Sequence, residues 1–129
     1  MGRFLETLDF PPAIFLASDA RRTQTTAHVL SAFVAGKVST FRAMYTFGVN
    51  SLWQAVGDVI LSGILDTEHS VAVVGHNSAV SDLGVELACH HDAGSLPTLG
   101  MVELTFAGNW DALLKGERVS LAQRLEPQA

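Results

Sequence analysis

Short apolar runs separated by longer segments of helical spacing run through this chain. Residues 13–17 (Ala-Ile-Phe-Leu-Ala) and 71–75 (Val-Ala-Val-Val-Gly) are uncharged, which predicts strands buried on both faces, as in a parallel sheet. In residues 101–106, apolar and polar side chains alternate, which predicts a half-buried strand. Weaker patterns predict a short strand over 41–47 and an edge strand that begins at Val119.

The segment after the first apolar run has the start and stop signals of a helix. Ser18 or Asp19 is expected to cap its N-terminus, and Gly36 is expected to end it just after Ala35. Helical spacing predicts the apolar face from Val29, Leu30 and Phe33.

Three further segments have helical character. Residues 1–8 are typical of the tail of a helix, and Pro11-Pro12 cannot continue it. Asn50 or Ser51 is expected to open the next helix, and residues 78–89 are predicted to form another behind the second apolar run. The apolar positions of the middle helix are Leu52, Val56, Val59, Ile60 and Ile64.

Alternating strands and helices, with a turn at residues 108–110 before the last strand, predict one α/β domain over residues 1–129. The expected architecture is a three-layer α/β/α sandwich around a mostly parallel mixed sheet. In such sheets ligands bind beyond the carboxyl ends of the strands. Two polar segments, residues 18–26 and 75–77, fall at those ends.

Charge and cysteine content narrow the class of protein. The formal net charge is −5, with only eight Lys and Arg residues, so no basic stripe is available to track a nucleic acid. The apolar runs are far shorter than the roughly 20 residues that cross a bilayer, and the start lacks the pattern of a signal peptide. Cys89 is the only cysteine, which excludes an internal disulfide and favours a cytoplasmic location.

The two polar segments carry side chains suited to a phosphoryl group, which proteins hold with cations and with backbone N–H groups at helix N-termini. Arg22 is in the first predicted turn, where its guanidinium can bind two phosphate oxygens. A cation there opposes the helix dipole, which favours a functional role over a structural one. His76 can neutralise developing charge or exchange a proton, and Ser18 and Asn77 can add polar contacts.

Alternative roles exist for these side chains. A histidine like His76 is, taken alone, more often a hydrogen-bonded core residue, and Asn77 fits a helix cap equally well. Arg21 is interpreted as a solvated neighbour of the site. His90-His91-Asp92 is not expected to bind metal, because adjacent histidines in a strand point apart and no third ligand has suitable spacing.

Residues 18–26 (Ser-Asp-Ala-Arg-Arg-Thr-Gln-Thr-Thr) and the run ending in Gly75-His76-Asn77 resemble the second and third signatures of the histidine phosphatase superfamily, the phosphoglycerate mutase-like proteins. The similarity is closest to the small bacterial phosphohistidine phosphatases and extends to Met44-Tyr45, which matches a short strand of that family. The resemblance implies phosphoryl transfer from a phosphohistidine protein or a phosphoester to an enzyme histidine and then to water. It implies no metal or organic cofactor, with Arg22 clamping the phosphate and His76 completing the pocket.

The first signature of that family, an Arg-His-Gly on a central N-terminal strand, does not occur in these 129 residues. It carries the nucleophilic histidine, so we expect an N-terminally truncated domain that is inactive by itself. The alternatives are a non-catalytic phospho-ligand or partner-binding module that has lost the nucleophile, and an ordinary α/β domain with a chance match. The absent strand would lie between strands 71–75 and 101–106. Those strands should therefore pair directly, or pair with another chain in an oligomer.

Overall fold

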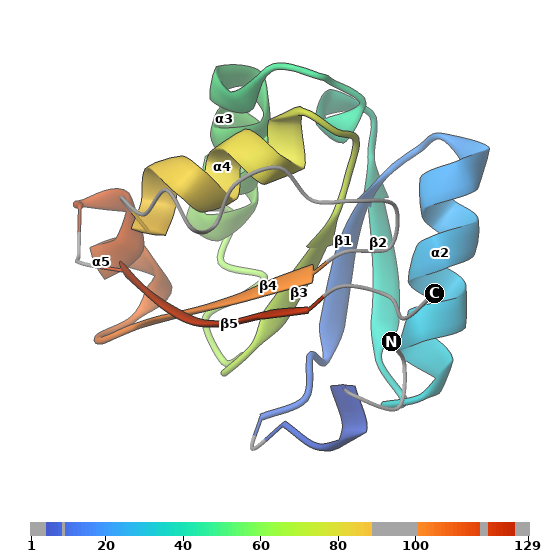
Figure 1. Ribbon diagram of the computed structural model, residues 1–129, viewed down its shortest axis with the longest axis horizontal. Coiled ribbons are helices and arrows are strands. Elements are labelled where there is room, and N and C mark those ends of the chain that lie inside the picture. Colours follow the sequence, from blue (N-terminus) through green and yellow to red (C-terminus); the bar gives the residue numbers. More distant parts are fainter. Residues whose placement is uncertain (1–4, 9, 89–100, 117–118, 126–129) are drawn as a thin grey trace.

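The computed structural model describes residues 5–8, 10–88, 101–116 and 119–125. Figure 1 shows the helices and strands in their spatial arrangement. In chain order they are β1 (Ile14–Ser18), α2 (Arg21–Ala32), β2 (Lys37–Phe41), the 3₁₀ helix η1 (Arg42–Met44), α3 (Val49–Leu61), β3 (Val71–Val74), α4 (Ala79–Ala88), β4 (Met101–Phe106), α5 (Trp110–Leu114) and β5 (Val119–Leu125).

The described strands form two sheets. The order of the first is β2-β1-β3 with every pair parallel, so that Ile14 lies opposite Lys37 on one side and Val71 on the other. The second consists of β4 and β5, which pair antiparallel. The prediction of an α/β fold with a mostly parallel sheet is confirmed.

The edges of the two sheets stay apart. Among the described strands, β3 pairs only with β1 and β4 only with β5, so the direct pairing of β3 with β4 that the sequence left open does not occur. Residues Val71–Val74 are only half-buried, and the prediction that this strand is fully buried is wrong. Among the described strands β3 has a neighbour on one side only, and part of its surface is therefore uncovered.

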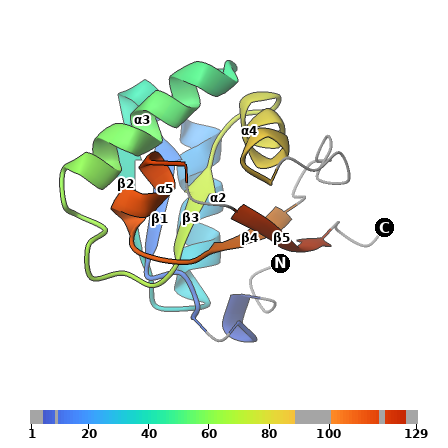
Figure 2. The same cartoon turned by 90° about the vertical axis from the view of Figure 1, so that its left-hand side faces the viewer.

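Helices cover both faces of the parallel sheet. Side chains of β1 alternate between the two faces: Phe15 and Ala17 pack with Ala27 of α2, whereas Leu16 packs with α3. Figures 1 and 2 show α2 on one side of the sheet and α3 and α4 on the other. Phe15 and Leu16 are fully buried, and each such side chain stabilises the fold by about 1.5–3 kcal/mol.

The buried face of α2 differs from the predicted one. Thr23, Ala27 and Ser31, spaced four residues apart, are buried, whereas Val29 and Phe33 are 57% and 41% exposed. Small side chains let the helix lie close to β1. The two hydroxyls are satisfied locally, because Thr23 donates to the carbonyl of the N-cap residue and Ser31 to a carbonyl of the preceding turn. A prediction from hydrophobic spacing alone therefore assigns the wrong face of α2 to the core.

Both ends of α2 also differ from the prediction. The N-cap is Ala20, without a side-chain cap, because Ser18 belongs to β1. The helix ends at Ala32, and Ala35 has a positive φ of 52° in the turn that follows. Gly36 is required instead by close packing, since a Cβ there would lie 2.9 Å from Cε1 of Phe15.

Two other predictions need correction. The strand expected over residues 41–47 is wrong: β2 precedes it, anchored by Lys37 N–H donating to Ala13 O at 2.8 Å, and η1 follows. Met44-Tyr45 is therefore not a strand. Ile64 lies beyond the end of α3 and is 47% exposed, although the other predicted apolar positions of α3 are buried.

The remaining elements from β1 to β5 agree with the sequence-based prediction to within about two residues, except that α5 is a helix where only a turn was expected. The first half of the helix expected over residues 1–8 lies outside the described residues. Cys89 and the His90-His91-Asp92 segment lie outside the described residues. In the part of the chain that the structure describes, no helix is long and apolar enough to cross a membrane.

Candidate functional site

The parallel pairing of β1 with β3 brings two predicted site residues into contact. Ser18 is the last residue of β1, and His76 lies two residues beyond the end of β3, so both are at the carboxyl edge of the sheet. Although the residues are 58 positions apart, Ser18 Oγ lies 3.0 Å from His76 Nε2. Ser18 is fully buried and His76 half-buried, so the imidazole is held from inside the domain and remains accessible from outside.

The hydrogen bonds around Ser18 determine which imidazole nitrogen carries a proton. Thr23 Oγ1 donates its only hydrogen to backbone carbonyls, with Ala20 O at 2.9 Å and Ser18 O at 3.1 Å. The Ser18 hydroxyl also contacts Thr23 Oγ1, and either oxygen can be the donor there; with the Thr23 hydrogen on the carbonyls, Ser18 donates. Ser18 Oγ is left as the acceptor for His76 Nε2–H and, at 3.4 Å, for the N–H of Ala20.

This assignment leaves Nδ1 as the free nitrogen of His76, since it has no hydrogen-bond partner among the described residues. In the neutral imidazole Nδ1 accepts a hydrogen bond or a proton, and in the imidazolium it donates. In this arrangement the neutral His76 carries its proton on Nε2, and Nδ1 is left for another partner.

Two aromatic rings that the sequence analysis did not assign to the site flank His76. The centroids of the Tyr45 and Phe47 rings lie 4.8 Å and 5.0 Å from that of His76. Both rings are more than half exposed. The signal in the sequence is the Tyr-x-Phe pair at residues 45–47, which falls inside the segment that the sequence analysis predicts as a strand.

Arg22 is at the same edge of the sheet but is not engaged. It is the second residue of α2, which starts three residues after Ser18, and its side chain is exposed. Within the described residues its guanidinium has no hydrogen-bond or ion-pair partner. The structure therefore brings Ser18 and His76 together, whereas Arg22, four residues after Ser18, makes no hydrogen bond or ion pair with either.

Asn77 has a partner in the helix that follows it. Its Oδ1 accepts a hydrogen bond of 2.6 Å from Ser81 Oγ, and Ser81 is buried. Gly75 lets this helix approach the strand, because a Cβ there would lie 2.9 Å from Cγ2 of Val80. These contacts give Asn77 a local structural role, and its contact with phosphate stays a prediction.

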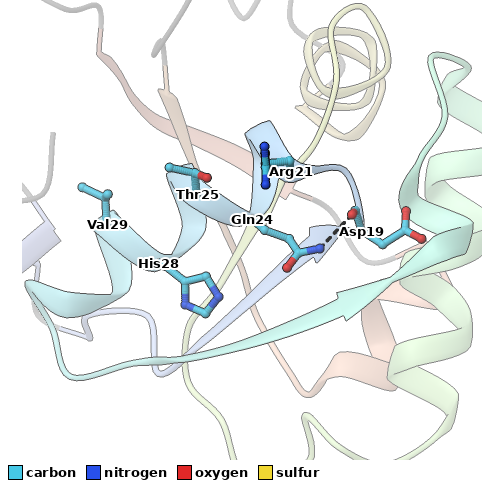
Figure 3. Close-up of a pocket in the computed structure, with 6 residues that line it drawn as sticks. All are labelled: Asp19, Arg21, Gln24, Thr25, His28 and Val29. Carbon is cyan, nitrogen blue, oxygen red and sulfur yellow. Dashed lines mark hydrogen bonds between the residues drawn. The ribbon is translucent and has the colours of Figure 1, made fainter.

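A separate hollow of about 460 Å³ runs along the outer side of α2 (Figure 3). Its lining consists of Asp19, Arg21, Gln24, Thr25, His28 and Val29. Gln24 Nε2 donates to Asp19 O at 2.7 Å across one end of it. The hollow contains neither Ser18 nor His76, so it is distinct from the site at the strand ends.

Among the described residues, no group of three His, Cys, Asp or Glu side chains is arranged to hold a metal ion.

Comparison with known proteins identifies the fold. No family model and no curated protein matches the sequence. Among solved structures, a protein assigned as phosphohistidine phosphatase SixA from Nakamurella multipartitia is 19% identical, with a TM-score of 0.79 over 99% of this chain and 78% of that one. The SixA assigned in Agrobacterium tumefaciens is 21% identical, with a TM-score of 0.64 over 91% and 69% of the two chains.

A mycobacterial glucosyl-3-phosphoglycerate phosphatase is 14% identical, with a TM-score of 0.67 over 93% of this chain and 79% of that one. At these identities the likeness concerns the fold. The fold implied by the resemblance of the two sequence signatures to the histidine phosphatase superfamily is therefore confirmed.

Proposed function

We propose that this chain acts in phosphatase-type phosphoryl transfer, with phosphohistidine as the substrate and with His76 and Arg22 as the groups that hold the phosphoryl group. The observation that carries the proposal is the 3.0 Å contact between Ser18 Oγ and His76 Nε2 at the carboxyl ends of two adjacent parallel strands. Open α/β sheets bind their ligands at this edge. The contact fixes the orientation of an ionisable side chain there.

Each group of the site has a distinct task in this proposal. His76 meets a phosphate oxygen through Nδ1, because Ser18 occupies Nε2. Arg22 binds two oxygens with its planar guanidinium, and its exposed, unengaged state leaves it available for this. The first N–H groups of α2 and α4 have no intrahelical partners and add a favourable field for an anion. Groups aimed in advance at the charge that develops in phosphoryl transfer lower its barrier.

The proposed reaction needs a histidine nucleophile that these 129 residues do not provide in the expected Arg-His-Gly context. The P–N bond of the substrate would break as a P–N bond to the enzyme histidine forms, and water would then release phosphate. His28 lies in the hollow on α2, and the ring of His69 stacks on Phe10 at 4.8 Å. Neither is placed by the structure beside His76.

The alternative is a non-catalytic module that binds a phospho-ligand or a phosphorylated partner. Both functions require the same phosphate site. They differ in turnover, which only the first provides.

A titration with inorganic phosphate, followed by NMR on the ring signals of His76, tests the proposal. Two charge-assisted contacts at about 1.5–3 kcal/mol each correspond to a dissociation constant in the millimolar range or tighter. Arg22→Ala should weaken binding at least about tenfold, the equivalent of one such contact. Arg21→Ala is the matched control, since Arg21 lines the hollow on α2, and it should change binding less than about threefold. Unchanged His76 signals, or an Arg22→Ala variant that binds as well as the wild type, would contradict the proposal.

A further inference from the structure

Tyr45 and Phe47 are held firmly beside His76 by the segment between η1 and α3. Met44, the last residue of η1, is fully buried. The turn that follows it is hydrogen-bonded at successive positions, from Tyr45 N–H to Arg42 O and from Thr46 N–H to Met44 O, both at 2.9 Å. The two aromatic side chains therefore project from an ordered turn.

The two rings form a contiguous aromatic surface that includes His76. Their centroids are 6.2 Å apart in a T-shaped arrangement, and each lies within about 5 Å of the imidazole. Such distances are typical of favourable aromatic pairs. Yet Tyr45 remains 53% exposed and Phe47 58% exposed. Orienting His76 therefore uses only part of the aromatic surface at this place.

We infer that Tyr45 and Phe47 form a platform for a planar ring bonded directly to the phosphoryl group, so that the site favours imidazole and aryl phosphates over alkyl phosphates. This inference rests on the proposed function, since it places the phosphoryl group at His76. A ring attached directly to phosphorus stays close to the phosphate oxygens, and the Tyr45 and Phe47 ring centroids lie 4.8 Å and 5.0 Å from that of the imidazole. An alkyl group of the same size has no π-system with which to stack.

Three phosphonates test the platform, because their P–C bonds resist hydrolysis and their charges are alike. Methylphosphonate measures the phosphate site alone, cyclohexylphosphonate adds apolar surface, and phenylphosphonate adds an aromatic ring. NMR titration of the 129-residue chain should show phenylphosphonate binding about 3–10-fold more tightly than cyclohexylphosphonate, the preference expected from one stacked aromatic pair.

Substitutions then show which side chains produce the preference for phenylphosphonate. Phe47→Leu and Tyr45→Leu should each reduce the phenyl-over-cyclohexyl ratio toward one, whatever change in methylphosphonate binding follows from the altered support of His76. Tyr45→Phe should keep the ratio. Phe10→Leu is the matched control: Phe10 is 59% exposed and also stacks on a histidine, His69, so its replacement should change nothing. The three side chains replaced are more than half exposed, so folding is not at risk.

The outcomes separate the platform from the phosphate site. Equal binding of phenylphosphonate and cyclohexylphosphonate to the wild type would overturn the platform. So would a Phe47→Leu variant that weakens all three phosphonates equally, since the ring would then only orient His76. If methylphosphonate itself fails to perturb His76, the proposed function fails, and the platform with it.

Discussion

The Ser18 hydroxyl is the structural link between the core and the candidate site, and Ser18→Ala should both destabilise the domain and release His76. Ser18 is fully buried, and its oxygen contacts Thr23 Oγ1, His76 Nε2 and the N–H of Ala20. The substitution removes all three contacts and adds no bulk. Its cost can therefore be estimated from the hydrogen bonds alone.

We expect a loss of about 1–3 kcal/mol in the free energy of unfolding. Two of the three contacts, those to Thr23 and His76, are within hydrogen-bond distance, and a typical intramolecular hydrogen bond contributes about 0.5–1.5 kcal/mol net. The contact from the Ala20 N–H is 3.4 Å long and adds little. The larger cost of an unsatisfied buried group is avoided, because Thr23 keeps its carbonyl partners and half-buried His76 can bind water.

Urea denaturation of wild type and variant measures this loss as a shift in midpoint at constant slope. Ser120→Ala is the control, since Ser120 is an exposed serine in a strand, and it should shift stability by less than about 0.5 kcal/mol. The phosphate affinity of Ser18→Ala should fall as well, because the imidazole is no longer oriented. A stability change no larger than that of Ser120→Ala, with phosphate binding intact, would refute the assigned hydrogen-bond network.

Three other predictions follow from the same structure. Thr23→Val removes the acceptor for the Ser18 proton, so Ser18 should donate to His76 and shift its neutral tautomer from Nε2–H to Nδ1–H. ¹⁵N shifts of the ring report this, and a retained Nε2–H form would contradict the assignment. The purified 129-residue chain should not hydrolyse a phosphohistidine peptide or an aryl phosphate, since loss of a nucleophile costs on the order of 10⁶ in kcat in a serine protease. Robust turnover that His76→Ala abolishes would contradict this prediction and show that His76 or another histidine of the chain acts as the nucleophile. The separate edges of β3 and β4 should make the chain self-associate or unfold easily, and a monodisperse monomer of high thermal stability in sedimentation would refute that.

The central contact of the site follows from rules that act over short stretches of sequence. Two uncharged runs predicted β1 and β3, and parallel pairing places the residues that follow such strands at one edge. Ser18 and His76 could therefore be expected to lie close together before any distance was known. The order and direction of the strands decide which strand ends lie side by side, and so which residues meet at that edge.

The rest of the site depends on contacts that no local pattern encodes. Tyr45 and Phe47 reach His76 because β2 lies on the far side of β1 and the chain after it crosses the carboxyl edge of the sheet toward α3. Thr23 was missed for another reason: hydrophobic periodicity assigns polar residues to the surface. A hydroxyl that bonds to backbone carbonyls in its own turn can be buried at little cost, as Thr23 is.

A crystal structure of the chain with tungstate, a tetrahedral stand-in for phosphate, tests the central claim most directly. An anion at the strand ends can be told from one in the hollow on α2, because the hollow is lined by Arg21 and His28 and does not contain His76. We predict the anion at the carboxyl ends of β1 and β3, within hydrogen-bond distance of His76 Nδ1 and the Arg22 guanidinium. An anion bound instead in the hollow, against Arg21 and His28 with His76 unoccupied, would contradict the account.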